Sequence, residues 1–113
     1  MGKSIVEYYV SSSGENPVKE FLDSLNERQQ RKLLRILSYI KSYGLESVIP
    51  HLKRIKGTPL WEIRILGADN IRVIYMTFEE GNVLLLHGFV KKTQKTSPRE
   101  ISLALQRFEE WIR

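Results

Sequence analysis

A stretch late in the chain contains the side chains best suited to chemistry on a phosphate group. His87, Phe89, Lys91, Lys92 and Lys95 lie between residues 87 and 100. Imidazole exchanges protons near neutral pH, and lysine ammonium groups bind phosphate oxygens. An exposed aromatic ring beside such cations can stack on a base. The stretch therefore indicates a site for a nucleic-acid backbone.

Earlier charged residues can complete a site for RNA cleavage. When the 2′-hydroxyl of RNA attacks the neighbouring phosphate, a base takes its proton, cations stabilise the developing charge and an acid protonates the leaving oxygen. Glu62, His87 or a lysine of lowered pKa can act as the base, and arginines suit two-point phosphate contact. The expected catalytic residues are Glu62, Arg64, Arg72, His87, Lys91 and Lys92, and the expected RNA-binding residues are Lys53, Lys56, Phe89 and Lys95, with Arg54 also at the rim.

These residues also have structural interpretations, which the sequence leaves open. A histidine in a strand commonly forms hydrogen bonds within the sheet, and surface lysines are commonly solvated. Glu62 can simply pair with Arg64 or Arg72. Two histidines and no cysteine give no metal-ligand spacing, so neither a metal nor another cofactor is expected.

Length and charge predict one small domain with a polyanionic partner. The 113 residues suffice for a single core, and the domain is expected to span residues 1–113. Residues 51–99 contain nine Lys and Arg against four Asp and Glu, which accounts for the net charge of +5. No segment resembles a membrane span or a signal peptide, and the lack of cysteine suits a reducing compartment, so a cytoplasmic location is expected.

Capping and turn residues organise the first half of the chain into a strand and two helices. A strand is expected over residues 4–10. Asn16 followed by Pro17 predicts a helix start, and Asn26 predicts a second start with a stop at Gly44. Their aliphatic positions recur at helical spacing, so we expect an antiparallel helical hairpin packed on a sheet.

The second half is predicted to form strands followed by one helix. A short edge strand over residues 51–56 precedes strands over 60–66, 71–78 and 83–90. Ser97-Pro98-Arg99-Glu100 predicts a capping box at the start of an amphipathic last helix. The predicted fold is α+β, with an N-terminal strand, the helical hairpin, an antiparallel sheet of about four strands and the C-terminal helix.

Alternation along the strands predicts a core face and a polar face. The residues expected on the core face are Trp61, Ile63, Ile65, Val73, Tyr75, Leu84, Leu86 and Val90. Those expected opposite them are Glu62, Arg64, Arg72, Ile74, Met76, His87, Phe89 and Lys91. The charged candidates would therefore share one surface.

Turn lengths then predict the neighbours across the strands. A two-residue turn at Gly81-Asn82 is expected in one hairpin, and a turn of three or five residues at 67–70 in the other. The resulting pairs are Arg72 with Lys91, Met76 with His87, Glu62 with Met76, and Arg64 with Ile74. Glu62 and His87 would flank the middle strand about 10 Å apart, close enough to bracket one nucleotide.

The sequence also resembles a known family along nearly its whole length. The resemblance rests on Leu60-Trp61-Glu62-Ile63-Arg64, Arg72-Val73-Ile74-Tyr75, the run from His87 to Thr96, and Pro98, Glu100-Ile101 and Ala104. These segments resemble the phage-derived HigB-like branch of the RelE/ParE toxin superfamily. The Phe-x-Lys-Lys-Thr-x-Lys-Thr run before the last helix is its most specific part.

The resemblance implies a type II toxin that cleaves messenger RNA on the ribosome without a metal. It implies that an antitoxin, usually of helix-turn-helix type, silences the protein. The strand cations of the superfamily correspond to Arg64 and Arg72, and its late basic residues to Lys91 and Lys92. Many RelE-type enzymes have a lysine where Glu62 stands and a tyrosine in the last helix, which this chain lacks. Two other functions are considered: a ParE-like gyrase poison without nuclease activity, and a nucleic-acid-binding module without catalysis.

Overall fold

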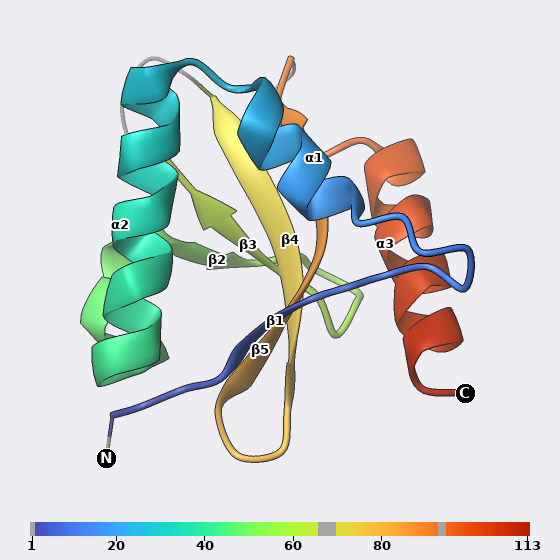
Figure 1. Ribbon diagram of the computed structural model, residues 1–113. Helices are drawn as coiled ribbons and strands as arrows, with labels where there is room; N and C mark the ends of the chain where they lie inside the picture. The colour runs from blue at the N-terminus through green and yellow to red at the C-terminus, as the bar shows by residue number, and fades with distance from the viewer. Residues whose placement is uncertain (1, 66–69, 93–94) are drawn as a thin grey trace.

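A five-stranded mixed sheet forms the centre of the protein (Figure 1). The computed structural model describes residues 2–65, 70–92 and 95–113. The strands are β1 (Val6–Tyr8), β2 (Leu52–Arg54), β3 (Trp61–Arg64), β4 (Ile71–Phe78) and β5 (Asn82–Val90), in the order β1-β5-β4-β3-β2. β1 runs parallel to β5, and all other neighbours are antiparallel. The predicted α+β fold is confirmed, and the N-terminal strand forms one edge of the sheet.

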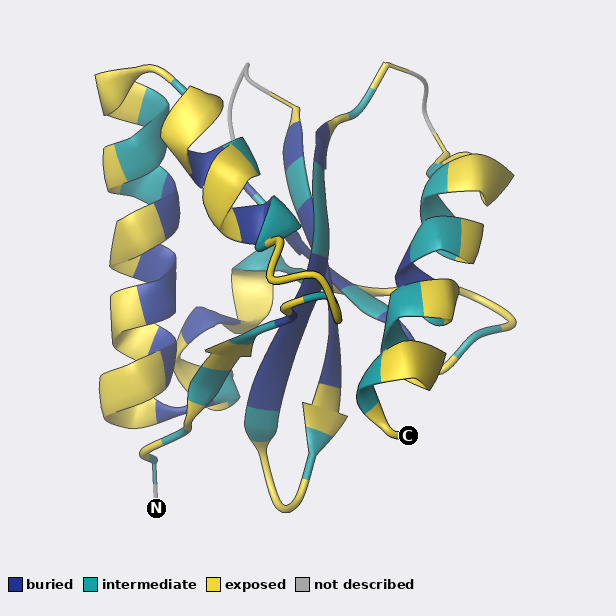
Figure 2. Ribbon diagram, turned by 45° about the vertical axis from the view of Figure 1, so that its right-hand side comes forward, coloured by how far each residue is buried: buried dark blue, intermediate teal, exposed yellow. Residues whose placement is uncertain are grey.

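Helices cover both faces of this sheet and create two separate cores. The helices are α1 (Pro17–Ser24), α2 (Glu27–Tyr43), the 3-10 helix η1 (Leu45–His51) and α3 (Pro98–Trp111). Figure 2 places α2 and α3 on opposite sides of the sheet, each with its buried residues turned toward it. The core beneath α1 and α2 contains Ile63, Val73 and Tyr75, and the core beneath α3 contains Ile74 and Leu86. None of the described helices is long and apolar enough to cross a membrane.

The ends of the first two helices form as local sequence predicts. The side chain of Asn16 accepts a hydrogen bond from the backbone N–H of Lys19. Asn26 and Gln29 form a reciprocal capping box at the start of α2. Gly44 ends α2 with a φ of 83°, which a residue with a Cβ rarely adopts. The chain after Gly44 continues directly into η1.

The sequence predicts the start of α3 correctly, but the predicted capping box does not form. Ser97 occupies the N-cap position and Pro98 the first helical position. The Ser97 side chain forms no capping hydrogen bond. Glu100 is unavailable for the box because its carboxylate binds the ring of His87.

The hairpin between β4 and β5 is one residue longer than predicted. Phe78 pairs with Asn82, so the loop consists of Glu79-Glu80-Gly81 instead of Gly81-Asn82. Glu79 and Gly81 have φ values of 40° and 88°, and this three-residue loop shifts the pairing. As a correction to the predicted pairs, Arg72 lies opposite Phe89, Ile74 opposite His87 and Met76 opposite Leu84.

A bulge in β5 changes which residues face α3. The pairs step from Ile74–His87 to Tyr75–Leu85, which leaves Leu86 as the extra residue. Leu84 and Leu86 consequently join Ile74 in the core beneath α3. Their predicted place beside Val73 is wrong, and the face expected to be polar contains a hydrophobic core.

The pairing of β3 with β4 is shifted by two residues from the prediction, so each side chain still lies on the predicted face of the sheet. Glu62 lies opposite Ile74, and Arg64 lies opposite Arg72. Because Ile74 also pairs with His87, Glu62 and His87 flank the middle strand as predicted, although at Ile74 and not at Met76. The turn predicted at residues 67–70 lies outside the described residues apart from Asn70.

Candidate functional site

A cleft of about 260 Å³ opens between the β2–β3 edge of the sheet and the start of α3. We call it the basic cleft. Its lining residues are Lys53, Arg54, Ile55, Lys56, Glu62, Lys91, Lys95, Thr96 and Ile101. Five of these residues are lysines or arginines, and one is a carboxylic acid. Counted over the described residues, the cleft is therefore a concave surface of positive potential with one negative charge.

Glu62 is the carboxylate of the basic cleft, and its position is held from two sides. Its side chain is 2% exposed, and the segment before α3 lies against it. The hydroxyl of Thr96 donates a hydrogen bond to Oε2 of Glu62. The Nε of Arg72 lies 3.7 Å from Oε1. The predicted pairing of Glu62 with a strand arginine is therefore confirmed for Arg72.

The two strand arginines lie opposite one another and are not among the lining residues of the basic cleft. Arg64 on β3 pairs with Arg72 on β4, and both side chains are half-buried. Within residues 2–65, 70–92 and 95–113, the buried Nε atom of each has no hydrogen-bond partner. Burial lowers the pKa of Arg72, the carboxylate of Glu62 raises it, and the neighbouring Arg64 lowers it further. Two neighbouring cations beside the carboxylate of Glu62 favour an anionic ligand nearby.

Burial and the charges of its neighbours change the pKa of Lys91, a lining residue of the basic cleft. Burial lowers its pKa, and the charges of Arg72, Lys53 and Arg64 lower it further, against an opposing effect of Glu62. Its backbone N–H donates to the carbonyl of Asn70, which fixes the strand end relative to β4. A lysine with a lowered pKa can give up its proton more easily than an ordinary one.

His87 lies outside the lining of the basic cleft and is bound on both ring nitrogens. Arg107 donates to its Nδ1 at 3.1 Å, so Nε2 carries the proton and donates to Glu100 at 2.6 Å. Burial lowers the pKa of His87; the hydrogen bond and charge of Glu100 oppose this effect, and Arg107 adds to it. The ring therefore connects β5 to α3 as a neutral group, which matches its structural interpretation. Its catalytic role stays a prediction.

The expectation that Phe89 is an exposed base-stacking ring is wrong. Phe89 is 8% exposed and stacks on His87 with ring centroids 5.4 Å apart. It belongs to the core beneath α3, because the amphipathic last helix covers this face of the sheet.

The family of the chain follows from comparison with known proteins. A model of the family described as phage-derived protein Gp49-like (DUF891) matches residues 20–109, which include every candidate residue from Lys53 to Lys95. The chain belongs to this Gp49-like family. The family is of RelE/ParE-like toxin type. No curated protein matches the chain.

The structure of this Gp49-like protein brings most, but not all, of the predicted residues together. Lys53, Lys56, Glu62, Lys91 and Lys95 line the basic cleft, with Arg64 and Arg72 behind its carboxylate. Lys92 is exposed and outside the lining. In the run Phe-x-Lys-Lys-Thr-x-Lys-Thr, Thr93 and Gln94 lie outside the described residues.

Sequence reasoning missed the residues that organise the site from the α3 side. Thr96 had no assigned role, although it holds Glu62, and Arg107 was not singled out, although it binds both His87 and the carbonyl of Leu86. The position of Thr96 within a lysine-rich run was a signal that could have revealed its role. No local sequence feature marked Arg107. Within the described parts of this Gp49-like chain, no three His, Asp or Glu side chains gather as a metal site.

Proposed function

We propose that this Gp49-like protein is the toxin of a type II toxin–antitoxin pair, of the HigB-like branch, and that it cleaves messenger RNA on the ribosome. The observation that carries the proposal is the basic cleft, where five cations surround one buried carboxylate. Such an arrangement binds a phosphodiester and offers groups that can take and give a proton.

The proposed reaction is transfer of the phosphoryl group to the 2′-oxygen of the same nucleotide. The 2′-oxygen forms a bond to phosphorus while the bond from phosphorus to the 5′-oxygen breaks. The 2′-proton passes to Oε1 of Glu62, and the leaving 5′-oxygen takes a proton from the ammonium group of Lys91. The products are a 2′,3′-cyclic phosphate and a 5′-hydroxyl end.

Arginine and lysine side chains stabilise the charge that develops on the phosphate. Arg72 lies beside Glu62 and opposite Arg64 on the neighbouring strand, and Lys53 and Lys95 line the cleft. Such preorganised cations can supply the largest share of the rate enhancement. The reaction proposed here uses these cations where other nucleases use a metal ion.

The proposed partners follow from the toxin type of the family. The ribosome would present the message in an extended form that enters the basic cleft. A cognate antitoxin, of helix-turn-helix type by the resemblance, would silence the protein in the cytoplasm.

Mapping of RNA ends after brief induction tests the proposal. Primer extension on a reporter message should reveal new 5′ ends at in-frame codons for the wild type and for Lys41→Ala, which removes a cation far from the cleft. The variant Lys53→Ala/Lys91→Ala, at equal abundance, should give no new ends. Growth arrest with an intact message would contradict the proposal, and so would equal cleavage by this double variant.

A further inference from the structure

A second groove lies on the other face of the same sheet edge. It has a volume of about 300 Å³ and is bounded by α2, η1 and the end of β3. We call it the α2–η1 groove; the residues used below are Lys32, Arg35, Ile36, Tyr39, Val48 and His51. Nothing in the proposed cleavage chemistry uses these residues.

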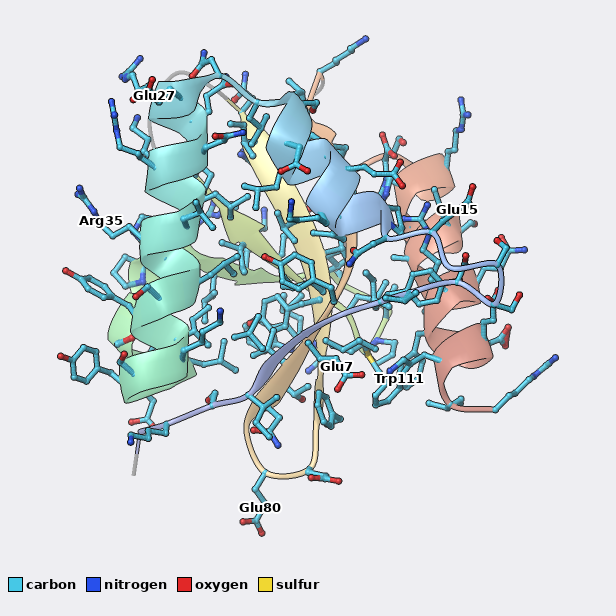
Figure 3. The ribbon with its side chains drawn as sticks, in the orientation of Figure 1. Glu7, Glu15, Glu27, Arg35, Glu80 and Trp111 are labelled. Atoms are coloured by element: carbon cyan, nitrogen blue, oxygen red, sulfur yellow. The ribbon has the colours of Figure 1, made fainter. Side chains whose placement is uncertain are left out.

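In the part of the chain that the structure describes, the charged side chains that line the groove are basic. Its ionisable lining residues are Lys32, Arg35, Tyr39 and His51, and no carboxylate lines it among the described residues. Arg35 extends outward from α2, away from the sheet (Figure 3). The groove therefore attracts an anion from solvent, as the basic cleft does.

The floor and wall of the groove suit a planar apolar group. Ile36 and Val48, at 6% and 2% exposure, lie among its lining residues and belong to the core beneath α2. Tyr39 is 48% exposed, and its ring meets that of Tyr43 edge-on at 6.1 Å between centroids. The exposed ring of Tyr39 can receive a base, since stacking on an aromatic ring is the usual contact with single-stranded nucleic acid.

The two sites meet at strand β2. His51 lines the α2–η1 groove and Lys53 lines the basic cleft, so residues two positions apart, at most about 7 Å, belong to different sites. The Nδ1 of His51 lies 3.1 Å from the carbonyl oxygen of Arg64, whose side chain lies behind the basic cleft. Lys53, Arg54 and Lys56 are exposed along this edge, so cations lie between the two sites.

We propose that the α2–η1 groove is a second RNA subsite, in which the strand that occupies the basic cleft continues around β2 and places phosphates on Lys32 and Arg35 and a base on Tyr39. This inference rests on the proposed function, because the basic cleft must hold the same strand. An acidic protein segment is the other ligand of suitable charge; RNA is favoured because the groove continues the positive surface of a phosphate site.

Binding of two oligonucleotides of different length tests the subsite. The probes are fluorescein-labelled 2′-O-methyl uridine 12-mer and 3-mer, which lack the attacking hydroxyl. The test variant is Lys32→Gln/Arg35→Gln, and its control is Lys19→Gln/Lys41→Gln, which removes the same charge from residues outside both sites. For the 12-mer, the slope of log affinity against log salt should fall by about 1.4 in the test variant, because each lost phosphate contact contributes about 0.7 on a single strand. The control should keep the wild-type slope.

The affinity of a variant without the Tyr39 ring tests the proposed base stacking separately from the charges. Tyr39→Ala should weaken 12-mer binding about five-fold or more, as expected for the loss of one base–aromatic stack. The same variant should leave 3-mer binding unchanged, because the short probe fills only the basic cleft. Equal 12-mer affinities for wild type, Tyr39→Ala and Lys32→Gln/Arg35→Gln would overturn the subsite.

A variant of the basic cleft separates failure of the subsite from failure of the proposed function. If Lys53→Gln/Lys91→Gln weakens binding and the groove variants do not, the proposed function stands and the second subsite is wrong. If neither the cleft variant nor the groove variants bind more weakly than the control, the proposed function and the second subsite are both wrong. If only the groove variants weaken binding, one strand does not occupy both the groove and the basic cleft, and the proposed second subsite is wrong.

Discussion

Thr96 donates its hydroxyl proton to Oε2 of Glu62, and this bond ties the segment before α3 to the centre of the sheet. The two residues lie 34 positions apart in the chain. With Arg72 at 3.7 Å from the other oxygen, the bond fixes the carboxylate of Glu62 in the basic cleft. The bond therefore joins the two walls of the cleft, β3 on one side and the segment before α3 on the other.

Removal of this hydroxyl should destabilise the protein. Thr96→Val keeps the shape of the side chain but leaves a buried carboxylate oxygen unsatisfied, which costs about 1–3 kcal/mol. Urea denaturation should report that loss in the free energy of unfolding. Thr77→Val on the exposed part of β4 is the control and should change it by less than about 0.5 kcal/mol. Equal effects of the two substitutions would mean that the bond contributes no stability.

The proposed acid role of Lys91 predicts a pH dependence of cleavage. Because burial and neighbouring cations lower its pKa, its ammonium group loses the proton at a lower pH than an ordinary lysine. An acid must be protonated to act, so cleavage should fall as the pH rises through that lowered pKa. Lys91→Arg stays charged throughout, so it should cleave more slowly and without this alkaline decline.

Single-turnover cleavage of a ribosome-bound message between pH 7 and about 10.4, the ordinary pKa of lysine, measures both profiles. Lys91→Ala should reduce the rate about 10²- to 10⁴-fold, the usual contribution of a general acid. A wild-type profile that stays flat over this range would remove Lys91 from the acid role.

His87 should make stability depend on pH in the acidic range. Burial lowers its pKa in the folded protein, so the unfolded chain binds the proton first as the pH falls through about 6.5. The free energy of unfolding should therefore decrease from that pH downward and level off below the folded pKa. His87→Gln should lose this part of the dependence in urea denaturation at pH 7.5, 6.5 and 5.5. Parallel pH dependences of variant and wild type would refute the assignment.

Gly88 should not tolerate a side chain. A Cβ at this position would lie 2.3 Å from Cδ2 of Phe21, so the ring of α1 packs directly on the backbone of β5. Gly88→Ala should lower the stability by about 1–3 kcal/mol, as overpacking usually does. Phe21→Leu combined with Gly88→Ala should recover part of the loss, because the two changes share one contact. Additive losses in thermal denaturation would show that the clash is not the cause.

Sequence patterns predicted the parts of the fold that depend on local interactions. Asn16, Asn26 and Gly44 mark helix ends through hydrogen bonds within a few residues, and alternation along β3 and β4 placed Glu62, Arg64 and Arg72 on one face. Strand alternation is a local property of the backbone, so the faces survived an error of two residues in the pairing.

The errors arose at one unusual turn and where contacts between distant residues decided the structure. Glu79 adopts a positive φ that its residue type does not favour, and this lengthened the hairpin loop. The bulge at Leu86 then turned apolar residues toward α3. The amphipathic pattern of the last helix was the overlooked signal, because its apolar side requires an apolar partner on the sheet. Phe89 supplies part of that partner and is therefore buried.

The most direct test of the account is the chemistry of the RNA ends that the wild type produces on a translated reporter message. Transfer to the 2′-oxygen at the basic cleft predicts a 2′,3′-cyclic phosphate on the upstream fragment and a 5′-hydroxyl on the downstream fragment. Lys53→Ala/Lys91→Ala should yield neither. Upstream fragments that end in a 3′-hydroxyl, or the same cyclic phosphate ends from the double variant, would contradict the account.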